Sequence, residues 1–353
     1  MITRYTTATL TLAFITLLTG SAAARQLGPV DCSAGASLAE AIAAAPAGAT
    51  ILVTGTCAET VVIKTDDLTI EGVNGAVIDG QMSGPDAVID TVTIDAARRV
   101  TLRNLTTQGG RHGIFVDRGA SATLEGITSQ DNRFDGIRAD KNSIVDVSGA
   151  MLRRNGDDGL EYGAGAAGTI RDTTSQENND DGYAATGGGS ITTQGAVVST
   201  QNGDDAITIT TGSNIRIFNT DMSLNQNDDD GLSLTVNSSA LMAASTFSSS
   251  DNGQDEAGGD GIQILSASAF TVLSSTMDIN RNANNGIRAT RNASLSITSN
   301  STLNLLDNGN ADLALFNSSA ATISSSTTLT ISDSPDMDVL ISPESVCGTC
   351  PMI

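Results

Sequence analysis

The fold is decided by the stretch NDDGYAATGGGSITTQGAVVSTQNGDDAITIT, residues 179–210, which contains two copies of one pattern. In each copy a pair of Asp residues precedes a small residue, Gly182 or Ala206, and a short apolar run follows. We call the small residue the anchor. Anchors and their equivalents stand at Gly113, Gly136, Gly159, Gly182, Ala206, Gly231, Gly261, Gly286 and Asp312. Their spacing of 23 to 26 residues, with one interval of 30, is typical of a stacked β unit.

Columns through the repeat show which side chains point into the protein. Residues one and three positions after each anchor are apolar, as in Ile207 and Ile209, whereas the residue between them, such as Thr208, is of mixed character. This alternation predicts a strand with one buried face. A second strand follows each turn, and the long interval contains GQDEAGG, residues 253–259, which predicts a loop. We therefore expect an all-β protein with about ten to twelve coils of about 23–25 residues over residues 50–340.

An Asn residue recurs four positions before most anchors. It stands at Asn132, Asn155, Asn178, Asn202, Asn227, Asn282 and Asn308. A stacked Asn can exchange amide hydrogen bonds with its copy on the next strand while it also bonds the turn backbone. On this pattern the chain resembles the right-handed parallel β-helix proteins of the pectate-lyase-like superfamily. The resemblance implies the fold but no single activity, because that fold carries lyases, hydrolases, epimerases, phage tailspikes and adhesins.

Both ends of the stack need caps, because an open parallel stack exposes hydrogen-bonding edges. Residues 1–24 have the charge, apolar run and small residues of a signal peptide, with an uncleaved anchor as the alternative. Residues 25–353 then form a single domain, which we expect outside the cytoplasm as a secreted, periplasmic or cell-surface protein. A short helix over 37–45, with Ser37 as its N-cap, caps one end, and residues 341–353 cap the other.

The four cysteines fit an exported protein. Cys32 and Cys57 flank the predicted helix, and we expect a disulfide that ties the cap to the first coil. Cys347 and Cys350 form CGTC near the C-terminus, for which a structural disulfide is favoured over a redox pair or half of a zinc site.

The charge restricts the partners. Asp and Glu number 40 against 18 Lys and Arg, which gives a net charge of −22. This charge argues against nucleic acid and against an anionic membrane surface, and it favours cations. His112 is the single histidine, and no apolar stretch after the signal peptide is long enough to span a membrane.

Acidic residues form two columns beside the anchors. One position before the anchor stand Asp135, Asp158, Asp181, Asp205, Asp230 and Asp260, and two positions before stand Asp157, Asp180, Asp204 and Asp229. With strands roughly 4.8 Å apart, these like charges repel along the stack. Three things can offset the repulsion: bound cations, raised carboxyl pKa values, or the use of Asp as a local turn cap.

Two of these offsets give specific hypotheses. As a turn former, Asp-Asp-Gly would use Gly for an unusual φ and Asp for a local hydrogen bond. As a metal site, the columns would bind Ca²⁺ between coils, because hard cations select clustered carboxylate oxygens. The predicted ligands are Asp157, Asp158, Asp180, Asp181, Asp204, Asp205, Asp229 and Asp230.

A catalytic hypothesis comes from residues 177–185 and 202–209, which are similar to the polygalacturonase-type glycoside hydrolases. The resemblance implies an inverting mechanism with Asp181, Asp204 and Asp205 as the catalytic carboxyls. The next coils depart from that family, with Asp229-Asp230-Gly231 in place of Gly-His-Gly and Gln263 in place of Arg-x-Lys. A lyase of this fold needs an Arg or Lys base beside Ca²⁺, and few basic residues stand in the outward column.

The sequence therefore favours an exported, non-catalytic protein whose acidic face binds divalent cations, with extracellular polysaccharide as a further candidate ligand. The alternative is a polysaccharide hydrolase or lyase that uses Asp181, Asp204 and Asp205. Only 3% of residues are aromatic, so platforms for sugar rings are expected to be absent.

Overall fold

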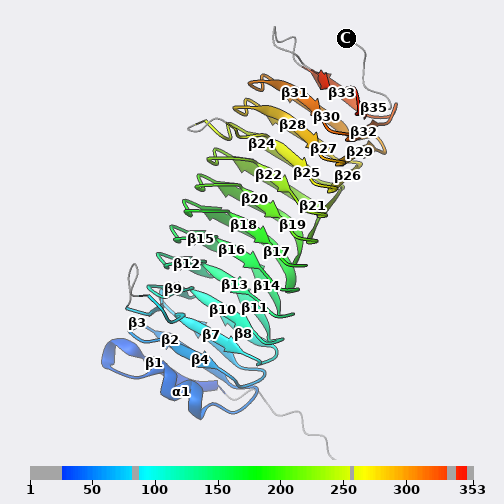
Figure 1. Cartoon of the computed structure of the whole chain (residues 1–353). Coiled ribbons are helices and arrows are strands. Elements are labelled where there is room, and N and C mark those ends of the chain that lie inside the picture. Colours follow the sequence, from blue (N-terminus) through cyan, green and yellow to red (C-terminus); the bar gives the residue numbers. More distant parts are fainter. Residues whose placement is uncertain (1–25, 82–86, 255–257, 332–338, 348–353) are drawn as a thin grey trace, which may run out of the picture.

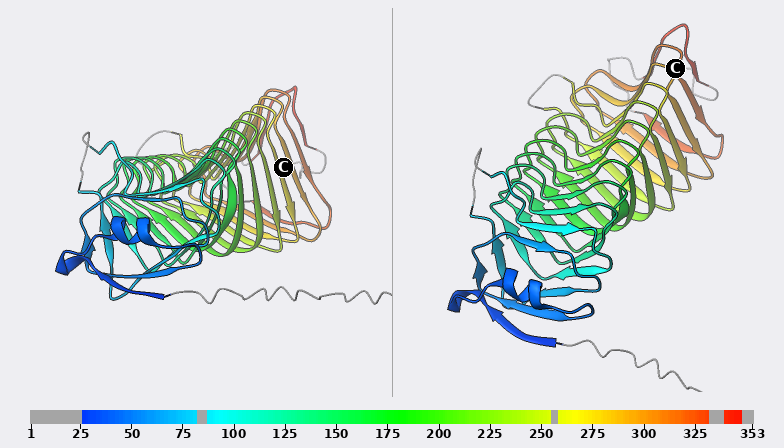
Figure 2. Two further views of the ribbon diagram at one scale, coloured as in Figure 1. Left: turned by 90° about the horizontal axis from the view of Figure 1, so that it is seen from below. Right: turned by 60° about the horizontal axis from the view of Figure 1, so that its bottom comes forward.

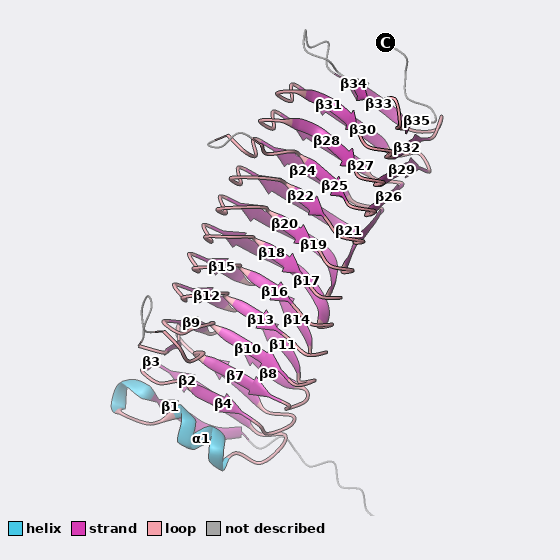
Figure 3. Cartoon of the chain, in the orientation of Figure 1, coloured by secondary structure: helices cyan, strands magenta, loops and turns pink. Residues whose placement is uncertain are grey.

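The chain winds into a single column of stacked coils (Figure 1). The computed structural model describes residues 26–81, 87–254, 258–331 and 339–347, so the predicted signal peptide lies outside the described residues. Strands make up almost all of the regular structure, and every strand pairing is parallel (Figure 3). Figure 2 shows each coil lying on the one before, with helix α1 (Leu38–Ala44) against the N-terminal end of the column.

One face of the column is a sheet of twelve strands, one from each coil, which we call the first face. Its strands are β4 (Val61–Ile63), β7 (Val92–Asp95), β10 (Ile114–Asp117), β13 (Ile137–Ala139), β16 (Leu160–Tyr162), β18 (Tyr183–Ala185), β20 (Ile207–Ile209), β22 (Leu232–Leu234), β25 (Ile262–Leu265), β28 (Asn285–Thr290), β31 (Ala311–Leu315) and β34 (Val339–Ile341). The anchors immediately precede most of these strands, and equivalent residues pair in register, such as Ile207 with Leu232.

The other two faces belong to a second sheet of 23 strands. Its strands are β1 (Gln26–Asp31), β2 (Thr50–Thr54), β3 (Thr56–Cys57), β5 (Thr69–Gly72), β6 (Val77–Asp79), β8 (Val100–Arg103), β9 (Thr106–Gln108), β11 (Ser121–Glu125), β12 (Thr128–Gln130), β14 (Ile144–Ser148), β15 (Met151–Arg153), β17 (Ala167–Gln176), β19 (Ser190–Thr200), β21 (Asn214–Asn225), β23 (Ser239–Ala243), β24 (Thr246–Ser250), β26 (Ala269–Leu273), β27 (Thr276–Asn280), β29 (Ser294–Thr298), β30 (Thr302–Leu306), β32 (Ala320–Ile323), β33 (Thr328–Ile331) and β35 (Val346–Cys347). The two faces form one sheet because β17, β19 and β21 continue through the corner between them.

The N-terminal end is closed as the sequence indicates. Ser37 is the N-cap of α1, where its side chain accepts from the N–H of Glu40. Cys32 and Cys57 form the expected disulfide. Strand β1, which precedes the helix and pairs with β2, was not expected from the sequence.

At the C-terminal end, pairing continues to Cys347, because β35 pairs with β32 beyond the expected last coil at residue 340. Cys350 lies outside the described residues, so its pairing with Cys347 stays a prediction. No helix in the described part of the chain is long and apolar enough to cross a membrane.

The inward columns form the core, with Ile207 and Ile209 no more than 1% exposed. The outward column of the first face is more covered than the sequence suggests. Ala184 is 2% exposed, Glu161 8% and Gln263 9%. Other residues of this column, among them Phe115, Arg138, Thr208 and Arg288, are half-buried, so the outer side of this sheet is only partly covered.

The predicted Asn ladder is present and has one more member. Each Nδ2 donates to the Oδ1 of the Asn one coil later at 2.9–3.1 Å, in an unbroken series from Asn132 to Asn308. The additional member is Asn252, which joins Asn227 to Asn282. It stands nine residues before its anchor, Gly261, because the long loop lies between them. The loop therefore leaves the stack without interrupting the ladder.

The anchors are small for a different reason from the predicted one. Anchor glycines such as Gly159 and Gly182 do not have positive φ, so the expectation of an unusual φ is wrong. Instead, a Cβ at Gly182 would lie 2.7 Å from the carbonyl oxygen of Ala206 and would also collide with Ser199 Oγ. The close approach of the next coil therefore selects glycine. At Ala206 itself, Leu224 stands in the place of that serine, and a methyl group is accommodated.

We expect Gly182→Ala to lower the free energy of unfolding by about 2–3 kcal/mol, because the new methyl group forces backbone movement in a packed stack. The matched change Ala206→Gly removes a methyl group from the equivalent position and should cost about 1 kcal/mol. Urea unfolding followed by circular dichroism measures both. Equal costs would show that close approach does not select the anchor.

Candidate functional site

The inner acidic column forms a second ladder along the edge of the first face. Each side chain accepts the backbone N–H of its equivalent on the next coil, at 2.7–3.4 Å. We call this series the carboxylate ladder, and it runs through Asp90, His112, Asp135, Asp158, Asp181, Asp205, Asp230, Asp260 and Asn285. The Asp residues of this inner column therefore cap the backbone of the next coil rather than that of their own turn.

The second oxygens of the ladder have partners that differ from coil to coil. Asp205 Oδ2 accepts from Thr208 Oγ1 at 2.6 Å, Asp230 Oδ2 accepts from Gln263 Nε2 at 2.5 Å, and Asp260 Oδ2 accepts from Arg288 Nε at 2.5 Å. Among the described residues, Asp158 Oδ2 accepts no hydrogen bond. The second oxygens are thus bonded at Asp205, Asp230 and Asp260 but not at Asp158.

Burial and mutual repulsion shift the ladder carboxyls toward their neutral form. Burial is the largest cause, and it raises the pKa of Asp205 to about 7. The pKa values of Asp158, Asp181 and Asp230 are also well above the usual range, first from burial and then from neighbouring carboxylates. In the outer column, burial and the charge of Asp135 raise the pKa of Asp157 to about 6.

The two columns approach each other in three overlapping triads. In each triad one oxygen per residue lies within 4.8 Å of the others, and the triads are Asp157, Asp158 and Asp180; Asp180, Asp181 and Asp204; and Asp204, Asp205 and Asp229. Seven of the eight predicted metal ligands are thus brought together. The eighth, Asp230, lies outside the triads and is bonded to the Asp260 N–H and to Gln263.

The predicted catalytic carboxyls are adjacent but differ in access. Oxygens of Asp181 and Asp204, and of Asp204 and Asp205, lie within 4.8 Å. Inverting glycosidases separate their carboxyls by roughly 6.5–9.5 Å to leave room for water. Both oxygens of Asp205 are occupied, by the Asp230 N–H at 2.8 Å and by Thr208. This geometry favours a structural role for Asp205.

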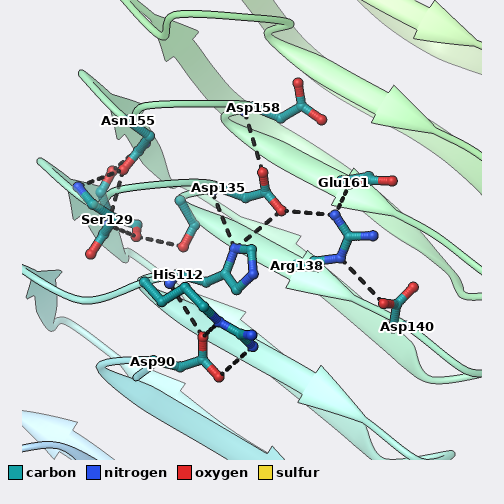
Figure 4. Close-up of polar contacts among 12 residues, drawn as sticks. Asp90, His112, Ser129, Asp135, Arg138, Asp140, Asn155, Asp158 and Glu161 are labelled. Carbon is teal, nitrogen blue, oxygen red and sulfur yellow. Dashed lines mark hydrogen bonds and ion pairs between the residues drawn. The ribbon is translucent and has the colours of Figure 1, made fainter. Parts of the chain in front are cut away.

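A group of charged residues around His112 lies at the N-terminal part of the same face (Figure 4). Arg138 contacts Asp135 at 3.3 Å and Asp140 at 3.2 Å, and it also pairs with Glu161. Glu161 Oε1 accepts from Thr186 Oγ1 at 2.6 Å, and burial, opposed by Thr186 and Arg138, raises the Glu161 pKa.

His112 replaces a carboxylate in the ladder. Its Nδ1 accepts the Asp135 N–H at 3.2 Å and also lies 3.2 Å from Asp135 Oδ2. Phe115 and Phe134 each lie 5.7 Å from the His112 ring. The guanidinium of Arg111 lies 5.5 Å from the Phe115 ring, and that of Arg133 lies 4.8 Å from the Phe134 ring. Sequence reasoning missed this aromatic cluster, although Phe115 in the outward column beside the single His was the available signal.

A pocket of about 460 Å³ lies at the other end of the columns, where the long loop begins and ends. We call it the loop pocket, and it is lined by Gly203, Asp204, Asp228, Asp229, Gly258, Gln263, Asn284 and Arg288. It was not predicted as a unit, because its residues come from four successive coils.

Comparisons with known proteins identify the fold. Residues 90–223 match the family model for a right handed beta helix region. The chain is similar to the A-module of mannuronan C-5 epimerase AlgE4 from Azotobacter vinelandii, at 15% identity over 88% of this chain and 94% of that chain, with a TM-score of 0.66. It is also similar to the periplasmic alginate epimerase AlgG, at 12% identity over 92% and 84% with a TM-score of 0.48. An alginate lyase from a Paenibacillus strain gives 13% identity over 90% and 98% with a TM-score of 0.45.

A search of curated proteins found no match. The predicted right-handed parallel β-helix is confirmed. At these identities the similarity concerns the fold, and the similar proteins named above carry names of enzymes that act on polysaccharides.

The ladder pKa values predict a stability that falls as pH rises. A carboxyl whose pKa is higher in the folded state keeps its proton when the unfolded chain has lost it, so stability declines between about pH 4 and pH 7. We expect the thermal midpoint of unfolding, measured with a chelator present, to be lower at pH 8 than at pH 5. Asp205→Asn keeps the acceptor for the Asp230 N–H without the charge, so it should stabilise the protein at pH 8, on the order of 1–2 kcal/mol, and change little at pH 5.

The surface change Asp131→Asn is the control, and it should leave the slope with pH unaltered. A destabilisation by Asp205→Asn that is equal at both pH values would contradict a buried carboxyl with a raised pKa.

Proposed function

We propose that the protein is exported and non-catalytic, and that its acidic edge binds divalent cations. The observation that supports this most directly is the set of three overlapping carboxylate triads along successive coils. Oxygen clusters of this kind suit Ca²⁺, which takes six to eight oxygen ligands. Export rests on the predicted signal peptide, residues 1–24.

The different environments of the inner and outer acidic columns support this proposal. The ladder residues use one oxygen to cap the next coil, so their positions are fixed by the fold. The outer residues lie closer to solvent, with Asp180 partly buried and Asp204 exposed. A cation would thus reach the outer carboxylates from water and use the second oxygens of Asp158 and Asp181 as fixed ligands.

The raised pKa values agree with this proposal. Burial, followed by the charge of neighbouring carboxylates, raises the pKa of Asp157 and of Asp181, so the charged forms of both carboxyls are disfavoured. A divalent cation would relieve the same repulsion that protons relieve at low pH, so Ca²⁺ and protons should compete. Polysaccharide is the second ligand that we propose for the same face. The similar structures support it only because they share this fold and carry the names of enzymes that act on polysaccharides.

Catalysis on a polysaccharide is the second candidate, and one observation favours it. Asp158, with a raised pKa and one oxygen without a hydrogen bond among the described residues, has an oxygen within 4.8 Å of one oxygen of Glu161. A carboxyl whose neutral form is favoured by burial, beside a second carboxyl, is an arrangement that enzymes use for acid–base chemistry.

We expect Ca²⁺ to stabilise the protein at pH 8, by about 2.7 kcal/mol when its concentration is 100 times Kd, and to have much less effect at pH 5. The double change Asp180→Asn and Asp204→Asn should remove most of the effect, because Asp180 and Asp204 each link two triads. Thermal denaturation and isothermal titration calorimetry measure both.

The matched control is Glu40→Gln with Glu125→Gln, which removes equal charge from exposed sites. A response to Ca²⁺ that is the same in both variants would rule out the triads as the site.

We expect no cleavage or epimerisation when the protein is incubated with a panel of neutral, acidic and amino polysaccharides. Reducing ends, unsaturated products and the proton exchange of the sugar ring are the measurements. Turnover that is lost in Asp158→Asn but retained in Asp260→Asn would replace the first proposal with the second.

A further inference from the structure

His112 occupies a position in the carboxylate ladder that aspartate fills on the coils before and after it, at Asp90 and Asp135. The two kinds of side chain respond differently to a proton. A protonated carboxyl gains an O–H donor but keeps an acceptor oxygen, so it can still cap a backbone N–H. A protonated imidazole carries a proton on both nitrogens and accepts no hydrogen bond. The bond from the Asp135 N–H to His112 Nδ1 can therefore exist only while the ring is neutral.

The structure also provides a partner for the charged ring. His112 Nδ1 lies 3.2 Å from the Asp135 nitrogen and 3.2 Å from Asp135 Oδ2, so it faces a donor and an acceptor of the same residue (Figure 4). A neutral ring accepts the N–H, whereas a charged ring donates its own Nδ1–H to the carboxylate. Asp135 is 0% exposed, so water does not replace the acceptor that its N–H then loses.

Packing keeps the ring in this position. His112 is 7% exposed, and its ring centre lies 5.7 Å from that of Phe115 and 5.7 Å from that of Phe134. Rotation of the ring away from Asp135 would disrupt both ring contacts. Uptake of a proton therefore changes the partner of Nδ1 and leaves the ring in place.

The charged groups around the ring are Asp90 on the preceding coil, Arg111 on the same coil, and Arg133, Asp135 and Arg138 on the following coil. Asp135 is the acid that faces Nδ1, and Arg138 Nη1 lies 3.3 Å from the same Oδ2. A charged His112 would share this oxygen with Arg138, which has further contacts with Asp140 and Glu161. The exchange at Nδ1 therefore needs no rearrangement of the arginine.

We propose that His112 is a proton-operated switch in the carboxylate ladder. In the neutral state the ladder continues from the coil of β10 to the coil of β13, and in the charged state an ion pair with Asp135 replaces that bond. Strand pairing between β10 and β13 does not involve the ring and holds in both states. Protons thus open the ladder at this bond and leave the bonds to the carboxyls intact. The inference does not rest on cation binding, because His112 and Asp135 belong to none of the three overlapping triads.

Nitrogen NMR of the ring tests the switch without overlap, because His112 is the single histidine. Nitrogen-15-labelled protein without a histidine tag is titrated from pH 9 to pH 4 with chelator present, and long-range proton–nitrogen spectra are recorded. We expect Nε2 alone to carry a proton at pH 9, and both nitrogens to carry protons at low pH while the protein is still folded. A ring with a proton on Nδ1 at every pH, or a ring that stays neutral until the protein unfolds, would overturn the proposal.

Amide hydrogen exchange measures the backbone bond itself. When the ring becomes charged, the protection factor of the Asp135 N–H should fall at least about tenfold, because this N–H loses its acceptor. The N–H groups of Asp181 and Asp205, which donate to carboxyls, are the internal controls and should keep their protection. An equal fall at all three amides would show general loosening of the stack and contradict a local switch.

Two variants separate the charge of the ring from its position. His112→Asn retains an acceptor and cannot become charged, so the Asp135 N–H should stay protected at both ends of the titration. His112→Asp places a carboxyl there, as on the neighbouring coils, and should give the same result. A pH-dependent fall that persists in a folded variant would assign the effect to another group and overturn the proposal. The titration of the unchanged protein decides the question if neither variant folds.

Discussion

The structure depends on side chains that bond the backbone of the neighbouring coil. Strand pairing holds the three faces together, but at the corner before the first face the chain turns and its N–H groups point along the column. There the Asn ladder and the carboxylate ladder supply the acceptors, and an unpaired buried N–H would be costly. The two ladders point in opposite directions. Asn155 N–H donates to the coil after it, whereas Asp181 N–H donates to the coil before it.

The bonds of the carboxylate ladder also place like charges close together along the column. An Asn side chain in each ladder position could accept the N–H of the next coil without carrying a charge. Carboxylates in those positions repeat a buried negative charge at every coil, and the outer column adds more. Arginines offset part of this charge, because Arg111, Arg138 and Arg288 pair with the ladder carboxylates Asp90, Asp135 and Asp260. The proposed cation binding would therefore couple stability to ligand binding through one set of oxygens.

Much of the fold was readable from the sequence because its signals are local and periodic. Anchors, inward columns, the capping helix and most of the Asn ladder follow from spacing alone. Asn252 was missed because a loop shifted it from its expected place. The reason for glycine at the anchors was also missed, since a contact with the next coil, not a local φ, determines it. Relations between coils are set by stacking, which spacing does not reveal.

The candidate site was predicted in part. The columns in the sequence identified the acidic residues that form the triads. They did not show which carboxylate oxygens already accept hydrogen bonds, as both oxygens of Asp205 do. The loop between residues 253 and 259 interrupts neither ladder, since Asn252 and Asp260 remain in register on either side of it. Its length and sequence can consequently diverge among descendants of this chain at little thermodynamic cost. Recognition could evolve there quickly on a scaffold that itself evolves slowly.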